Sequence, residues 1–170
     1  MLIVDSHFWS DTLNAFLFGP MTPTLADVLM LTGLNISATD SAYNLLARTS
    51  HRLEAKNVGG WKGYIDHQVR TGSIGDRECT TFLTMWIEKF IFCGKTVGPT
   101  TNMQTIAESL AIGHLIPLGK HLLGSVYYLV HQVSIKLSFE QLIGNLGGPW
   151  WFINLWLNLY MHKVLDQDLR

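Results

Sequence analysis

The chain has 170 residues, the usual size of one domain, of which 48% are hydrophobic and only 15% are charged. Its 12 Lys and Arg nearly balance its 13 Asp and Glu, so it lacks the basic excess typical of a free-standing DNA-binding domain. The six Trp, eight Phe and five Tyr predict a large core together with apolar surface kept for a partner. We expect one compact, mainly α multi-helix domain over 1–170, with frayed ends near 1–8 and 166–170.

The N-terminal part predicts a short β-hairpin or extended segment. Leu13 to Phe18 is rich in strand formers, and Gly19-Pro20 is a turn signal, so Met21-Thr22 is the expected second strand. Proline cannot donate to a ladder, so any hairpin here must be small and lie at an edge.

A capped helix follows directly. Thr24 stands where an N-cap is expected, Asp27 is its acidic partner in the first turn, and Gly33 ends the helix. The apolar stripe consists of Leu25, Val28, Leu29 and Leu31.

Two further segments show helical spacing before position 75. One begins at Thr39 or Asp40 and carries Ala42, Leu45, Leu46, Thr49 and Leu53. The other follows Gly59-Gly60 and is expected to turn Trp61, Tyr64, Ile65 and Val69 inward.

The clearest helix runs from about Arg77 to Cys93, and Gly94 ends it. Its wide apolar face is predicted from Cys79, Phe82, Leu83, Trp86, Ile87 and Phe90.

The C-terminal half reads as helices separated by Gly and Pro. A short helix around Met103 to Leu110 closes at Gly113, and a longer one follows Pro117. The longer helix should bury Leu122, Val126, Leu129 and Val133. Phe139, Leu142, Ile143 and Leu146 predict another short segment. A last helix starts at Pro149, where a missing N–H costs nothing, and turns Trp151, Phe152, Leu155, Trp156 and Leu159 to one side.

Motifs that carry chemistry are absent. Gly94-Lys95-Thr96 lacks the earlier glycine of a phosphate-binding loop, and no G-x-S-x-G elbow exists. Cys79 and Cys93 have no zinc spacing, and Pro117 separates His114 from His121. We therefore expect no enzyme activity, no catalytic residue, no cofactor and no metal.

The same pattern argues against targeting to a membrane. No basic or long apolar leader follows Met1, so we expect an intracellular protein. The uncharged run Gln141 to Met161 is interrupted by Gly, Asn and Pro, so we expect no membrane span.

Nucleic-acid binding is the alternative that the residues leave open. Residues 24–48 resemble the start of a helix-turn-helix, although Ser37 to Ser41 brings an acid where a recognition helix should present basic or amide side chains. A mild basic patch over 48–77 is the second possibility, and its cations are Arg48, Arg52, Lys56, Lys62, Arg70 and Arg77.

Four motifs in order resemble the plant mobile domain, a family also called "aminotransferase-like". They are Met21 to Val28 with Leu31 to Leu34, Phe82 to Thr96, Pro117 to Lys120 through Tyr127-Tyr128, and Gly147 to Phe152 with Leu155 to Leu157. The chain departs from the family pattern mainly between Asn35 and Asp76.

The resemblance implies a domain of plant transposable elements and of host genes derived from them. Host members are nuclear and act in transposon silencing, genome integrity and meristem maintenance, some with a phosphatase-like partner. No enzymatic activity is established for the domain, and this chain shows neither the Schiff-base lysine nor the phosphate cup of a pyridoxal phosphate enzyme.

The expected function is therefore a non-catalytic protein-interaction domain, whose partner is a phosphatase-like or chromatin-associated protein. Trp86, Trp151 and Trp156 are expected in the core. Trp9, Trp61 and Trp150 lie at segment edges and are the candidate partner surface, because aromatic residues are enriched in interface cores. The oligomeric state is left open.

Overall fold

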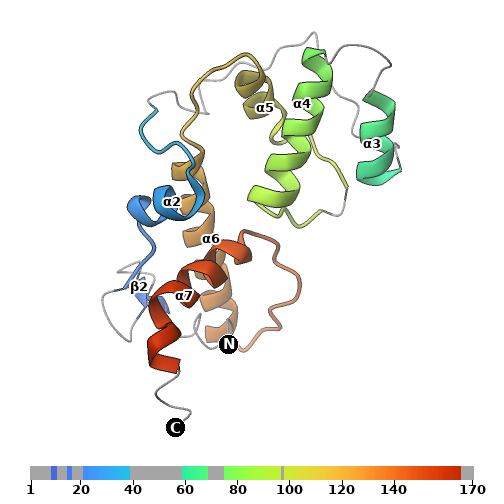
Figure 1. The fold of residues 1–170 in the computed structure, drawn as a ribbon. Helices are drawn as coiled ribbons and strands as arrows, with labels where there is room; N and C mark the ends of the chain where they lie inside the picture. Colours follow the sequence, from blue (N-terminus) through green and yellow to red (C-terminus); the bar gives the residue numbers. More distant parts are fainter. Residues whose placement is uncertain are drawn as a thin grey trace. The chain divides into compact units, whose positions relative to one another are not determined.

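A computed structural model describes residues 9–10, 15–16, 21–38, 59–68, 75–96 and 98–165 of the chain. The fold is mainly helical, as predicted. Its residues group into two compact units. Unit 1 consists of 1–36 and 119–170, and unit 2 of 37–118. Each unit is described by itself, and Figure 1 shows the elements of both.

The hairpin of unit 1 exists, but it pairs differently from the prediction. Strand β1 (Trp9–Ser10) is antiparallel to β2 (Ala15–Phe16), with Trp9 opposite Phe16. The predicted strand at Leu13 to Phe18 therefore pairs with the residues that precede it, and Met21, in the predicted second strand, is a β-bridge residue. The predicted Gly19-Pro20 turn lies outside the described residues.

Helix α2 (Leu25–Thr32) begins and ends as its sequence predicts. The backbone N–H and hydroxyl of Thr24 both donate to Asp27 Oδ2 at 2.8 Å, and the Asp27 N–H donates back to the Thr24 hydroxyl. This is a complete capping box. Gly33 closes the helix at φ 68°, a left-handed conformation that glycine adopts without steric cost.

Helices α6 (Leu118–Ser138) and α7 (Trp150–Leu165) complete unit 1 and lie beside α2 (Figure 1). The predicted α6 residues are buried: Leu122, Val126, Leu129 and Val133. On α7, Phe152 and Trp156 are buried as expected, while Leu155 and Leu159 are exposed and Ile153 and Leu157 take their place. Trp151 is only half-buried.

Two glycines allow close packing around α6. The backbone N–H of Gly119 donates to Asn35 O at 2.9 Å, so the start of α6 is tied to the segment after α2. A Cβ at Gly119 would lie 2.6 Å from Ile36 Cγ2. Gly148, at φ 108°, brings the segment before α7 against Leu129, where a Cβ would lie 2.8 Å from Cδ2.

The predicted segment at Phe139 to Leu146 is wrong, because it is not helical. Glu140 takes a left-handed φ of 52°, and the Gln141 N–H donates to Lys136 O, the bond of a Schellman motif that ends α6. Leu142 is 93% exposed. The apolar spacing of the segment Phe139 to Leu146 therefore does not mark a buried helix face.

Unit 2 is built from α3 (Gly60–Gln68), α4 (Asp76–Met85), the π-helix η3 (Trp86–Ile91) and α5 (Gln104–Ala111). The π-helix continues α4 directly, so the predicted helix from Arg77 is one continuous element. Figure 1 shows α3 and α5 on either side of α4. The core of unit 2 contains Tyr64, Thr84, Ile87 and Ala107.

The apolar face predicted for α4 and η3 is largely wrong. Phe82 and Phe90 are exposed, and Trp86 is half-buried rather than in the core. Ile87 is buried as predicted, but the rest of the buried face consists of other residues: Thr80, Thr81, Thr84, Glu88 and Ile91. The threonines can be buried because their hydroxyls bond their own helix: Thr84 Oγ1 donates to Thr80 O at 2.8 Å, which leaves the methyl group to pack.

The close approach at Gly119 gives a direct test of the unit 1 packing. Gly119→Ala should lower the free energy of unfolding by about 1–2 kcal/mol, since the overpacking penalty exceeds the gain in helix propensity. Gly124→Ala on the same helix is the matched control, because no atom lies within 4 Å of its Cβ. It should raise stability by up to about 1 kcal/mol. Urea unfolding measures both, and equal effects of the two changes would contradict the packing.

Candidate interaction surface

Buried carboxylates mark many catalytic sites, and this chain has three of them among its described residues: Asp27, Glu88 and Glu108. In unit 2, Glu88 accepts hydrogen bonds from the Thr100 N–H at 2.9 Å, from the Thr100 hydroxyl at 2.5 Å and from the Met103 N–H at 3.4 Å. These donors precede α5, so Glu88 satisfies the N-terminus of that helix. Glu108 accepts a bond from Gln104 Nε2 at 2.8 Å. Glu88 thus ties η3 to the segment that begins α5, whereas the Glu108–Gln104 bond lies within α5 itself.

Tyr64 lies beside the same helix face. Burial is the main cause that raises its pKa to about 12, while hydrogen bonding to Thr84 and Thr81 acts in the opposite direction. Trp61 packs edge-on against it, with ring centroids 5.8 Å apart. This phenol is a packed core group and would stay protonated at physiological pH.

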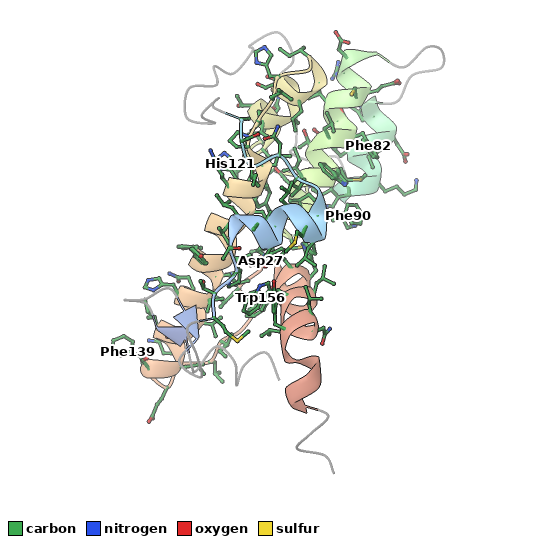
Figure 2. The ribbon with its side chains drawn as sticks, turned by 60° about the vertical axis from the view of Figure 1, so that its left-hand side comes forward. Asp27, Phe82, Phe90, His121, Phe139 and Trp156 are labelled. Atoms are coloured by element: carbon green, nitrogen blue, oxygen red, sulfur yellow. The ribbon has the colours of Figure 1, made fainter. Side chains whose placement is uncertain are left out.

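Asp27 is the buried carboxylate of unit 1, and it joins two helices. Besides closing the cap of α2, it accepts a hydrogen bond from the Tyr160 hydroxyl of α7, with 2.5 Å between Tyr160 Oη and Asp27 Oδ1. The indole of Trp156 lies on the same side of α7, and Figure 2 labels Asp27 and Trp156 where the two helices face each other. The only charged side chain of α2 therefore faces α7 rather than solvent.

The pKa of Asp27 reflects these contacts. Burial on its own raises the pKa of a carboxyl group, but hydrogen bonds from Tyr160, Thr24 and the Trp156 indole outweigh it and lower the pKa below 3.8. The donors favour the ionised form. Asp27 is therefore a permanently charged structural acceptor at neutral pH rather than a proton donor.

A second tie joins the segment before α2 to α6. Tyr127 donates its hydroxyl to Pro23 O at 2.7 Å, and the Thr22 hydroxyl donates to Tyr127 at 3.3 Å. The Gly119 N–H of α6 also donates to Asn35 O, beyond the other end of α2. The segments at both ends of α2 are therefore bonded to α6.

The outer faces of α2 and α7 are uncharged and expose large apolar side chains, with the polar Asn158 among them on α7. Asp27 is the only charged residue of α2, and α7 carries none between Trp150 and Tyr160. We call four exposed apolar residues of these two helices the α2–α7 apolar set: Leu29, Met30, Leu155 and Leu159. Tyr160 is also exposed but is left out of the set, because its hydroxyl is bonded to Asp27. Met30 is 68% and Leu159 56% exposed. Large exposed apolar side chains of this kind mark interaction sites.

The predicted partner tryptophans are divided between the units. Trp9 lies in β1 and Trp150 begins α7 in unit 1, whereas Trp61 is in unit 2. Trp61 and Trp150 are half-buried. Their role in binding stays a prediction. The α2–α7 apolar set adds Leu29, Leu155 and Leu159, which the helical spacing places on the predicted apolar faces, and Met30, which it does not. Helical spacing alone did not reveal them, because apolar residues surround both helices.

Most of the predicted nucleic-acid patch lies outside the described residues, namely Arg48, Arg52, Lys56 and Arg70. Lys62 is exposed and pairs with Asp66 at 2.7 Å, which raises the lysine pKa. Arg77 is exposed in the first turn of α4. Of the segment 24–48, which resembles a helix-turn-helix in sequence, the structure describes residues 24–38. Residues 33–38 are not helical.

In the part of the chain that the structure describes, no group of three or more His, Cys, Asp or Glu is placed to hold a metal ion. None of the helices in that part combines the length and the apolarity that crossing a bilayer requires.

The Asp27 carboxylate gives a pH-dependent prediction. Its folded pKa is lowered, so its stabilisation is present above the unfolded value and is lost as pH falls through the folded value. Asp27→Asn should cost about 1 kcal/mol at neutral pH, as for a lost helix cap. The difference from wild type should shrink below about pH 4.

Urea unfolding at several pH values measures this difference. Tyr160→Phe, which keeps the cap of α2 and removes only the bond from α7, should show the same pH trend with a smaller amplitude. A difference between wild type and Asp27→Asn that stays constant with pH would contradict the assignment.

Comparison with known proteins places the chain. Searches of curated proteins and of solved structures found no match. A family model described as "Plant mobile domain" matches residues 6–167, which covers both units and all four motifs. The chain therefore belongs to the plant mobile domain family.

Proposed function

We propose that the chain is a non-catalytic protein-interaction domain of a transposon-derived plant nuclear protein, acting in transposon silencing, genome integrity or meristem maintenance. Family membership supports the biological setting. The observation that carries the interaction role is the α2–α7 apolar set. These four residues lie on the uncharged outer faces of α2 and α7, two helices that contact each other.

The physical argument concerns the cost of this exposure. An exposed leucine taken singly is ordinary, but α2 and α7 expose large apolar side chains together and are joined by the Asp27–Tyr160 bond. Burying one such side chain in a partner contributes about 1.5–3 kcal/mol. A few of them therefore supply the anchors of a specific interface.

The absence of charge on these faces bears on the kind of partner. A nucleic-acid surface requires cations placed to neutralise phosphates, and none lies among the exposed residues of α2 or of α7 up to Tyr160. A protein surface with complementary apolar anchors fits better. The family resemblance favours a phosphatase-like or chromatin-associated protein.

Affinity purification from plant nuclei, followed by binding of the purified partner, tests the proposal. Met30→Glu combined with Leu159→Glu should weaken partner binding at least about tenfold, because both charges enter the centre of the contact. Both positions are exposed, so the fold should be retained. Gln141→Glu, a charge added to an exposed loop outside the set, is the control and should bind as wild type does.

Equal partner binding by the double variant and by Gln141→Glu would refute this surface. Retention of DNA or RNA instead of protein, with the salt dependence of phosphate contacts, would replace the proposal by the nucleic-acid alternative.

A further inference from the structure

The exposed face of α4 and η3 is a row of apolar residues that the proposed function does not use. Phe82 is 57% and Phe90 54% exposed, and Trp86 between them is half-buried. Figure 2 labels both phenylalanines on this helix. Cys79 and Cys93 continue the row at its two ends, and both are free, half-buried thiols. We call these five residues the aromatic row.

The π-helix aligns this row. In a regular α-helix, Phe90 would be rotated by roughly 80° from Phe82, since eight residues exceed two turns by that angle. A π-turn takes an additional residue per turn, so residues four apart lie nearly above one another. Because η3 spans Trp86–Ile91, it returns Phe90 to the line of Phe82 and Trp86.

The aromatic row is symmetric about Trp86. Phenylalanines stand four positions away on either side, at Phe82 and Phe90, and cysteines stand seven positions away, at Cys79 and Cys93. An interface between two identical copies related by a two-fold axis requires that residue i meets residue j while j meets i. Antiparallel pairing about Trp86 meets this condition with the same residue types in contact.

The charges at the two ends of the row fit the same arrangement. Asp76, Arg77 and Glu78 precede the row and leave its N-terminal end with one net negative charge, whereas Lys89 and Lys95 lie at or just beyond its C-terminal end. All of these side chains are exposed except the half-buried Glu78. Antiparallel pairing brings the acidic end of one copy to the basic end of the other. Parallel pairing would place acid beside acid and lysine beside lysine, which costs free energy.

We propose that two copies of this chain associate antiparallel through the aromatic row, with the two Trp86 side chains at the two-fold axis and Phe82 of each copy against Phe90 of the other. The partner is a second copy because the row is self-complementary in both residue type and charge. A single helix face is smaller than the roughly 800 Å² per partner of a standard interface, so the dimer should dissociate on dilution. The proposal is independent of the α2–α7 apolar set.

Sedimentation of the purified full chain over about 1 μM to about 1 mM tests self-association, since this range covers the affinity of small interfaces. Wild type should pass from monomer to dimer. Phe82→Glu and Phe90→Glu should each weaken the dimer at least tenfold while keeping the circular dichroism of the folded chain. Leu115→Glu, at another exposed apolar position of unit 2, should leave it unchanged.

A cysteine experiment tests the direction of pairing. Cys79 lies in α4, and Cys93 lies two residues beyond the end of the π-helix η3. The α-helical part from Cys79 to Met85 alone rises about 9 Å at about 1.5 Å per residue, and η3 follows it, so a bismaleimide linker of about 8 Å should not join the two thiols within one copy. Cys79→Ser and Cys93→Ser chains should not cross-link when each is alone. A mixture of the two should form covalent dimers, because Cys93 of one then meets Cys79 of the other.

The labelling should be run at mildly alkaline pH, because burial raises the pKa of the Cys93 thiol. A chain that stays monomeric throughout, or a dimer unaffected by Phe82→Glu and Phe90→Glu, would overturn the proposal. Cross-linking of either single-cysteine chain with itself, as efficient as in the mixture, would overturn the antiparallel arrangement. Binding of another protein through Met30 and Leu159 would be unchanged by any of these results.

Discussion

Unit 1 depends on one buried carboxylate. Asp27 accepts hydrogen bonds from the residue that begins its own helix and from Tyr160, far along the chain on α7. A charge buried without partners would be costly, so the contacts of Asp27 are obligatory wherever α2 packs. The carboxylate thereby sets the position of α2 against α7. Pro23 with Tyr127 and Asn35 with Gly119 then hold both ends of α2 on α6.

The residues that carried the family resemblance acquire physical roles from this arrangement. Thr24 and Asp27 form the cap, Gly119 admits the close approach of Ile36, and Gly148 admits Leu129. In unit 1 the family motifs therefore describe a packing corner.

In both units, polar groups are buried by satisfying one another within the unit, and apolar side chains are consequently left outside. On α4 and η3, the threonine hydroxyls bond the preceding helical turn, and Glu88 takes the free N–H groups before α5. These bonds allow a polar face to be the inner one. The aromatic row therefore remains on the opposite side, available to a partner.

Local signals predicted the helices well. The Thr24–Asp27 box, Gly33, and the α6 residues Leu122 and Val126 are confirmed, because capping chemistry and a one-sided stripe depend on neighbours in sequence. Sequence signals failed where hydrogen bonds between distant residues decide which side of a helix is buried. Nothing near Glu88 in the sequence indicates that Thr100 and Met103 will satisfy it, so the apolar side of α4 was assigned to the core. Leu29 and Leu159 were misplaced for a related reason, since a helix that is apolar on several sides does not reveal which side faces solvent.

Native-state hydrogen exchange in the Asp27→Asn variant tests the central claim most directly. The claim is that Asp27 joins α2 to α7 and, because both ends of α2 are bonded to α6, makes the three helices one cooperative unit. The amides of these three helices should share one opening free energy in wild type, and the substitution should lower it for all three together. Loss of protection confined to α2, with α6 and α7 unchanged, would contradict the claim and reduce Asp27 to a local helix cap.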